Sequence, residues 1–196
     1  MNILALETAS TICGVSLFLD KKMIDLDEIN KPKIHGQRLP IIVKQILERN
    51  KVKLNDLDGI AISIGPGSYT GLRIGLSFSK GLATSGNLPL IPIPTLSAIN
   101  YNINLEGEYS IMLHSHKEYV YLQDYSSGIA QNEVIFTDYK LKKNKLIFGF
   151  NLDHLNLDFN LAPPSSEAIA KIAIENFTKL KEDKIYKVIP NYITSI

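Results

Sequence analysis

Tryptophan is absent from this chain of 196 residues, and cysteine occurs only once, as Cys13. A single thiol cannot form a disulfide within the chain, which excludes a disulfide-stabilised secreted scaffold and fits a reducing compartment. An excess of charge of one sign is also missing, because 21 Lys and Arg residues face 20 Asp and Glu residues, for a net charge of +1. We therefore expect no direct, tight binding of nucleic acid by this chain alone.

Long hydrophobic runs are missing as well. No stretch approaches the ~18 uninterrupted apolar residues of a membrane span, and the start, from Met1 to Glu7, lacks the basic region and apolar run of a signal peptide. We therefore expect a cytoplasmic protein that has no membrane attachment. The composition that remains is that of a globular protein, with 45% hydrophobic and 21% charged residues, and the length suits one domain or two small ones.

The first part of the chain predicts three strands followed by alternating strands and helices. Apolar runs at 3–6 and 14–19 flank a polar turn at 8–11, which is typical of a hairpin. Alternating apolar and polar residues over 23–29 predict a third strand. The near-continuous apolar segment 59–64 predicts a strand that is buried on both faces.

Three helices are expected in this part. The first begins just before Pro40 and ends near Asn50. It is predicted by an apolar stripe at helical spacing, which consists of Leu39, Ile42, Val43, Ile46 and Leu47. A second helix is expected over 70–85 and a third over 95–104, with a short proline-containing strand at 88–93 between them.

The rest of the chain is less regular. Strands are expected over four segments, which are 108–113, 119–123, 133–136 and 145–150. Ser165 is expected to cap a last helix, and the end, 185–196, is expected to be extended. The element order predicts an α/β fold with mixed sheets flanked by helices, divided into an N-terminal subdomain, 1–104, and a shorter, diverged C-terminal subdomain, 105–196.

A glycine-rich loop between the strand at 59–64 and the next helix is the most informative part of the sequence. It consists of Gly65, Pro66, Gly67, Ser68, Tyr69, Thr70 and Gly71, with Arg73 shortly after it. The first N–H groups of the helix could hold a phosphate, although the Lys-[Ser/Thr] of a P-loop does not follow Gly71. Alternatively, small residues at every fourth position from Gly71 to Ala83 let another helix pack very closely, which offsets the ~1 kcal/mol cost of a glycine inside a helix. We favour the packing role.

The same loop carries a resemblance to a known family. Residues 65–75, GPGSYTGLRIG, are similar throughout to the motif G-P-G-S-[FY]-T-G-L-R-I-G of the TsaB (YeaZ) family. The segment 3–10 resembles that family's opening I-L-A-I-D-T-S-T, and residues 80–83 and 94–96 fit the segments that follow the loop. The resemblance extends over residues 1–100 and is faint beyond them.

This resemblance implies an actin-like ATPase (ribonuclease-H-like) fold of two similar halves and dimerisation through helices of the first half. It implies a scaffold without a catalytic centre or cofactor in the formation of N6-threonylcarbamoyladenosine in tRNAs that read codons starting with A. The partners would be a TsaD-type transferase, which catalyses the transfer, and a TsaE-type ATPase. The tRNA would be bound only through the complex.

Single polar residues do not form a catalytic or metal-binding pattern in the sequence. His35 lacks the second histidine at i+4 that the catalytic relative uses on a helix, and a lone imidazole is a poor metal site, so we interpret it as a surface or capping residue. His114 and His116 are expected to share one face of a strand, without a third ligand. Glu7 stands where actin-like enzymes place an Asp for magnesium, and Cys13 is expected to be an inert core thiol.

Two other functions stay open at this point. One is a phosphate- or nucleotide-dependent enzyme of the actin-like superfamily, which would use the glycine loop and the turn at 8–11. The other is a peptidase, a function suggested only by older family names and supported by no pairing of a nucleophile with a base.

The expected interface lies on helices of the first half, which would pair with a second copy or with TsaD. Its predicted residues are Leu39, Ile42, Val43, Leu72, Gly75, Leu76 and Ser79. Some of these residues must face their own sheet instead, and the sequence does not say which. Arg73, near the end of the loop, either pairs with a carboxylate or stays in water.

Overall fold

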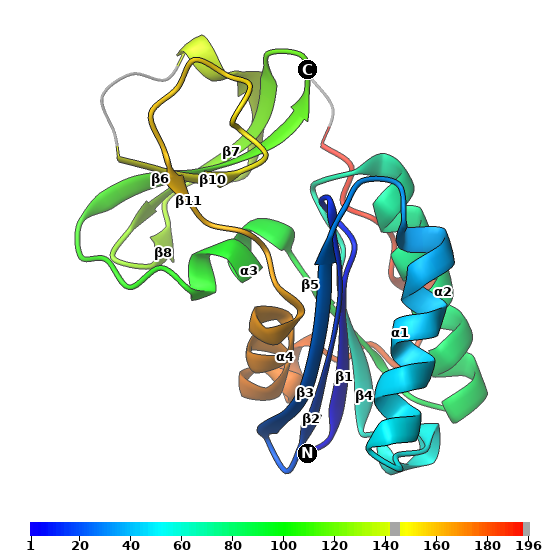
Figure 1. Cartoon of the computed structure of the whole chain (residues 1–196). Coiled ribbons are helices and arrows are strands. Elements are labelled where there is room, and N and C mark those ends of the chain that lie inside the picture. Colours follow the sequence, from blue (N-terminus) through cyan, green and yellow to red (C-terminus); the bar gives the residue numbers. More distant parts are fainter. Residues whose placement is uncertain (142–145, 194–196) are drawn as a thin grey trace.

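A computed structural model describes residues 1–141 and 146–193. Figure 1 shows two sheet-containing parts side by side, with helices flanking the first sheet. Within the described ranges, no helix combines the length and the apolar character needed to cross a membrane.

The first sheet has five strands in the order β3-β2-β1-β4-β5. These strands are β1 (Ile3–Glu7), β2 (Ile12–Leu19), β3 (Lys22–Asn30), β4 (Gly59–Ser63) and β5 (Leu90–Ile93). β1, β2 and β3 form an antiparallel meander, whereas β4 and β5 run parallel to β1. The predicted hairpin, third strand and buried strand are therefore confirmed.

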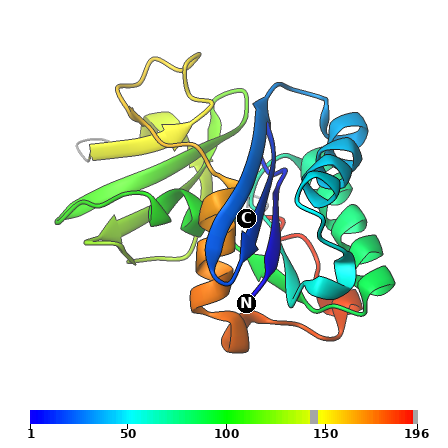
Figure 2. The same cartoon turned by 60° about the horizontal axis from the view of Figure 1, so that its bottom comes forward.

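Helices cover both faces of this sheet. α1 (His35–Arg49) and α2 (Tyr69–Gly86) lie on one face, and α4 (Ser166–Glu175) lies on the other, as Figures 1 and 2 show. α1 and α2 confirm that the first two predicted helices exist, but α1 begins at His35 rather than just before Pro40, so that Pro40 lies inside the helix. Ser165 caps α4 by accepting a hydrogen bond from the N–H of Ala168 at 3.1 Å.

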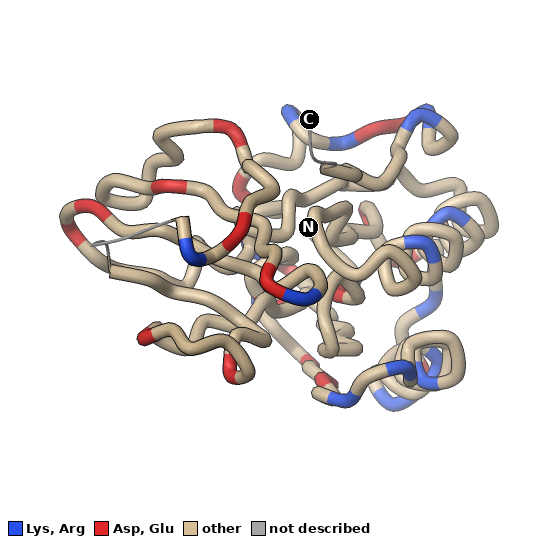
Figure 3. Tube along the Cα trace, turned by 90° about the horizontal axis from the view of Figure 1, so that it is seen from above, with Lys and Arg blue, Asp and Glu red and all other residues tan. Residues whose placement is uncertain are grey.

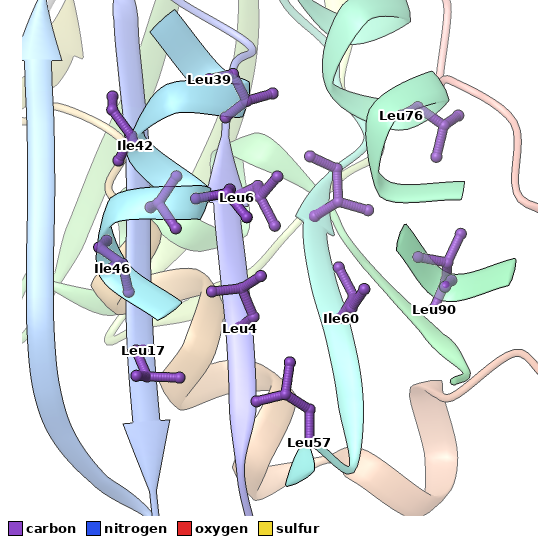
Figure 4. Packing of buried hydrophobic residues seen from close by; sticks show 14 of the residues in the cluster. Leu4, Leu6, Leu17, Leu39, Ile42, Ile46, Leu57, Ile60, Leu76 and Leu90 are labelled. Carbon is purple, nitrogen blue, oxygen red and sulfur yellow. The ribbon is translucent and has the colours of Figure 1, made fainter. Parts of the chain in front are cut away.

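The apolar run of β1 follows from this arrangement. Leu4 and Leu6 belong to the core under α1 and α2, whereas Ile3 and Ala5 belong to the core under α4. A strand buried on both faces needs apolar residues at successive positions. Figure 4 shows the first of these cores, where side chains of α1 point at the strands, among them Leu39, Ile42 and Ile46.

The second sheet follows the order β11-β10-β6-β7-β8, and β9 pairs with β7. Its strands are β6 (Glu108–His116), β7 (Tyr119–Ser126), β8 (Ile129–Ala130), β9 (Ile135–Asp138), β10 (Leu146–Phe150) and β11 (Asn160–Leu161). One face packs on α3 (Thr95–Tyr101), through Leu96 and Ile99. The other face is covered by the chain that connects β10 to β11 and by a 3-10 turn, η2 (Tyr139–Leu141).

Several boundaries differ from the predicted ones. The third helix ends at Tyr101 rather than at 104, and β6 continues to His116 through a bulge between His114 and His116. The two-residue strands β8 and β11 were not predicted, because two residues carry no readable periodicity. The end of the chain contains a 3-10 turn, η3 (Ile185–Lys187), within the segment that we expected to be extended. Residue 145 of the predicted strand and residues 194–196 lie outside the described ranges.

The last helices of the chain lie on the first sheet and not on the second. After the second sheet, the chain returns to the first sheet, where Ala168, Ala170 and Ala173 of α4 pack with Ile3 and Ala5. The predicted boundary at 104/105 thus separates the two sheets, but α4 and the short helix α5 (Phe177–Leu180) that follows it belong to the layers of the first sheet.

Candidate functional site

The glycine loop joins β4 to α2 and packs against the turn between β1 and β2. The N–H of Ser68 donates to the carbonyl oxygen of Ala9 at 2.7 Å, and Ser68 Oγ caps α2 by accepting from the N–H of Gly71 at 3.2 Å. A Cβ added at Gly67 would overlap the carbonyl of Ala9, and one added at Gly71 would overlap the carbonyl of Thr8. Glycine is needed at both positions because two backbone segments of the same chain approach each other closely.

The small-residue stripe continues this contact along α2. A Cβ on Gly75 would overlap the hydroxyl of Thr8, and Ser79 and Ala83 are fully buried. We expected this stripe to allow close packing of another helix, and this expectation was wrong. The stripe packs α2 against its own strands, which produces the same spacing of small residues in the sequence.

The contact also bears on the phosphate-binding hypothesis. Two of the donors that a phosphate would use, the N–H groups of Ser68 and Gly71, already bond to protein oxygens. A helix N-terminus binds an anion through such free N–H groups. These internal hydrogen bonds therefore argue against the hypothesis that the loop binds a phosphate.

A cleft of about 990 Å³ separates the loop from the second sheet. Its first wall consists of the turn at 9–11, the loop at 67–71 and the start of α1. Its second wall includes residues 113–116 at the end of β6, together with Tyr121 and Phe136. The first wall is mainly polar backbone and hydroxyl groups and the second is aromatic, and the volume lies in the range of small-molecule sites.

Glu7 lies at the end of β1, beneath this turn. Its Oε1 accepts a hydrogen bond from the N–H of Ala9 at 2.5 Å, and burial raises the pKa of its carboxyl group to about 8. Within residues 1–141 and 146–193, Oε2 of Glu7 has no hydrogen-bond partner. Burial therefore favours the protonated form of the Glu7 carboxyl group in the chain by itself.

Two buried residues have structural roles. The ring of His35 is 5% exposed and its Nε2 lies 2.9 Å from the carbonyl oxygen of Ile12, to which it donates. Our interpretation of His35 as a surface or capping residue was therefore wrong. Cys13 is buried, and burial raises the pKa of its thiol to about 11, as expected for an unreactive core thiol.

The two histidines of β6 do not act together. His114 approaches His154, with 2.9 Å between their Nε2 atoms, whereas the ring of His116 stacks on Tyr119 and Phe136. The bulge between His114 and His116 separates their surroundings. In the described part of the chain, no three side chains of His, Cys, Asp or Glu form a group that could hold a metal ion.

Arg73 forms contacts that sequence reasoning missed. Its Nε donates to the hydroxyl of Tyr192 at 2.9 Å, and its guanidinium lies 4.0 Å from the centre of the Tyr69 ring. The N–H of Asn191 donates to the carbonyl oxygen of Ile64 at 2.7 Å, which holds the C-terminal segment beside the loop. Arg73 therefore pairs with neither a carboxylate nor water alone, and a contact across 119 residues leaves no local signal in the sequence.

The predicted interface residues all lie in the interior of the chain. These residues are Leu39, Ile42, Val43, Leu72, Gly75, Leu76 and Ser79. Leu39, Ile42, Val43 and Leu76 belong to the core of the first sheet, because the apolar stripe of an amphipathic helix covers its own core first. That α1 and α2 meet another chain stays a prediction, and the exposed side chains of these helices would have to form the contact.

Charge is distributed unevenly over the molecule. In Figure 3, Lys and Arg lie mainly on the side of the helices α1 and α2, and Asp and Glu are frequent on the second sheet.

Comparison with known proteins gives consistent results. The family model described as "TsaD: tRNA N6-adenosine threonylcarbamoyltransferase" matches residues 31–183. The chain is 30% identical over 149 residues to the tRNA threonylcarbamoyladenosine biosynthesis protein TsaB of Haemophilus influenzae, a match that covers 76% of this chain and 58% of that protein. It is 40% identical over 96 residues to the TsaB protein of Escherichia coli, covering 49% and 41%. The matches thus span about half the length of these two relatives.

A third relative aligns over nearly its whole length. The TsaB protein of Buchnera aphidicola subsp. Baizongia pistaciae is 26% identical over 216 residues, covering 98% of this chain and 97% of that protein.

Solved structures define the fold. YeaZ from Pseudomonas aeruginosa superimposes with a TM-score of 0.82 at 21% identity, covering 98% of this chain and 99% of that one. An inorganic polyphosphate/ATP-glucomannokinase from Arthrobacter gives a TM-score of 0.51 at 9% identity, covering 91% and 99%. The predicted actin-like, ribonuclease-H-like fold class with two mixed sheets flanked by helices is confirmed.

Proposed function

Because the chain belongs to the TsaB (YeaZ) family, we propose that it is a non-catalytic scaffold subunit in the biosynthesis of threonylcarbamoyladenosine on tRNA. It acts in the cytoplasm and supports a TsaD-type transferase, with a TsaE-type ATPase as a further partner. The isolated chain forms a homodimer, and tRNA is bound only through the complex.

The observation that carries this proposal is the internal use of the glycine loop. The polar groups that an actin-like enzyme would turn toward a nucleotide are bonded within the chain, through Ser68, Ala9 and Gly71. Glu7, at the position of a magnesium ligand, is buried and its pKa is raised to about 8. The motif therefore builds a rigid platform, and a chain without chemistry of its own contributes through binding.

The surface proposed for this binding is the outer face of α1 and α2. The two helices lie side by side on the same face of the sheet (Figure 1). Ile41 of α1 is 42% exposed, and Ser77 and Gly81 of α2 are exposed and short. Short side chains allow a partner helix to approach closely, and an exposed isoleucine provides an apolar contact.

The test is a reconstituted modification assay with the TsaD-type and TsaE-type proteins and tRNA. Ile41→Glu should weaken assembly with the transferase at least about tenfold, because a charge would be buried in the contact, and it should reduce tRNA modification in parallel. The matched control is Ile129→Glu, which changes an isoleucine that is 69% exposed on the second sheet. It should leave assembly and modification unchanged.

Two results would be decisive, the first against the scaffold function and the second against the proposed surface. One is modification of tRNA, or turnover of any nucleotide, by the pure chain without its partners. The other is full assembly of the Ile41→Glu variant, measured by sedimentation, which would exclude the outer face of α1 as the contact.

A nucleotide-dependent enzyme is the second candidate, and the cleft of about 990 Å³ is the observation that favours it. Calorimetry with ATP and Mg²⁺ separates the two functions. Tight binding together with turnover by the isolated chain would support the enzyme, and the absence of both would support the scaffold.

A further inference from the structure

A pair of histidines at the mouth of the cleft is not used by the proposed function. His114 lies at the end of β6, and His154 lies in the connection between β10 and β11. Their Nε2 atoms are 2.9 Å apart, and their ring planes meet at 82°. His114 Nε2 is also 3.1 Å from the carbonyl oxygen of Lys117. Three atoms that can donate a lone pair therefore converge on one small volume.

A single proton occupies this volume when no other cation is bound. A carbonyl oxygen only accepts hydrogen bonds, so without a metal ion His114 Nε2 carries the proton that it donates to Lys117. A metal ion bound to this nitrogen would require the other tautomer, with the proton on Nδ1 and the lone pair of Nε2 free.

The directions of the two rings differ from those of an ordinary hydrogen bond. In a linear N–H···N bond at this distance the ring centres would lie about 5 Å apart, whereas they are 4.1 Å apart. The two ring axes are therefore inclined to each other, which a metal ion bound to both nitrogens would require.

We propose that His114 and His154, together with the carbonyl oxygen of Lys117, form a binding site for a divalent transition-metal ion. The two nitrogens are 2.9 Å apart. If each lies about 2.0–2.1 Å from a metal ion, the N–metal–N angle is about 90°. Right angles are typical of Ni²⁺ and Cu²⁺, whereas tetrahedral Zn²⁺ needs the nitrogens roughly half an ångström further apart. The remaining positions open toward the cleft, where water completes the shell.

The position of the site suggests what the metal would do. The connection that carries His154 also places Leu152 and Leu155 in the core of the second sheet, and its Asn151 accepts a hydrogen bond from Thr11 of the first part at 3.2 Å. A metal bound to His114 and His154 would fasten this connection to the end of β6. It would thus stabilise the covering of the second sheet and the edge of the cleft.

The experiment is a titration of the full chain, without a histidine tag, with Ni²⁺ by calorimetry. We expect one Ni²⁺ per chain, at least tenfold weaker binding in His154→Ala, and less than twofold change in His116→Ala. His154 is exposed, so its replacement leaves the fold intact, and His154→Gln provides a second variant of similar size. His116 is the matched control because it also lines the cleft but stacks on Tyr119 and Phe136.

Proton NMR gives an independent readout, because paramagnetic Ni²⁺ should broaden the imidazole signals of His114 and His154 before those of His35. Equal loss of affinity in the His116 and His154 variants, or unchanged affinity in both His154 variants, would overturn the site. Tighter binding of Zn²⁺ than of Ni²⁺ would overturn the right-angled geometry. An absence of Ni²⁺ binding to the wild-type chain would mean that the histidines share only a proton. None of these outcomes depends on the scaffold function.

Discussion

The two sheets of this protein are covered in different ways. The first sheet has helices on both faces, with α1 and α2 on one and α4 on the other. The second sheet has α3 on one face, but its other face is covered by the connection between β10 and β11 and by η2. A helix satisfies the hydrogen bonds of its own backbone and presents a continuous apolar stripe. An irregular segment has no such stripe and needs separate turns to satisfy its backbone hydrogen bonds.

The two parts also carry different features of the candidate site. The first part holds the glycine loop in close contact with the turn between β1 and β2. The second part provides the cleft wall and the histidine pair, and its covering segment is held by local bonds such as that from Leu155 N–H to the Leu152 carbonyl oxygen at 2.8 Å. We therefore expect changes in the first part to affect the whole fold, and changes in the second to be more local.

The largest effect is expected from Gly75→Leu. A Cβ there would already overlap Thr8, so α2 would have to move away from the first sheet at a cost of about 3 kcal/mol or more. We expect the variant not to fold under conditions in which the wild-type chain is stable, as measured by circular dichroism and urea unfolding. Gly81→Leu in the same helix meets open space, and it should be neutral or stabilising by up to about 1 kcal/mol.

This pair of variants also tests what the stripe is for. A Gly75→Leu chain that folds normally and only loses its dimer would show that the stripe serves a partner. It would then contradict the close packing of α2 on its own sheet.

A smaller loss of stability should distinguish the helical covering of the first sheet from the irregular covering of the second. Leu39 in α1 and Leu152 in the β10–β11 connection are both fully buried. Leu39→Ala should lower the free energy of unfolding by about 4 kcal/mol, because packed helices leave a cavity. Leu152→Ala should lower it by about 2 kcal/mol, because an irregular segment can relax into the space. Equal losses in urea unfolding would mean that the two faces are equally rigid.

The same contrast explains how much of the fold could be predicted from sequence. Periodicity indicated α1 and β3, and short apolar runs indicated β1, β2 and β4. The run at 59–64 indicated a strand buried on both faces, and β4 is fully buried. The covering of the second sheet by Leu152 and Leu155 could not be predicted, because residues in an irregular segment follow no period.

The candidate site shows a second limit of sequence reasoning. The loop at 65–71 was found by its glycines, but spacing alone could not tell whether the stripe faces the same chain or another. The contacts of Arg73 with Tyr192 and of His114 with His154 join positions far apart in sequence. Such pairs depend on how the chain folds back, and nothing near either residue indicates them.

The last prediction concerns the pH dependence of stability that the buried acid of the first part produces. Burial raises the pKa of Glu7 from 4.5 to about 8, so between these values the folded chain holds a proton that the unfolded chain has lost. The contribution of the protonated form is fully present below pH 4.5 and is lost as the pH rises toward 8. The wild-type free energy of unfolding should therefore fall by up to about 1.4 kcal/mol per pH unit across this window relative to Glu7→Gln.

Urea unfolding of both chains at several pH values measures this difference. Gln keeps a side-chain oxygen for the N–H of Ala9 and cannot ionise, so the slope assigned to Glu7 should vanish in Glu7→Gln. The matched change in the second sheet is Asp124→Asn, at a buried acid that accepts a hydrogen bond from the hydroxyl of Ser110 at 2.6 Å. It should leave the slope in place. If Glu7→Gln retained the wild-type slope, Glu7 would be ionised in the folded chain, which would contradict the rise of its pKa by burial.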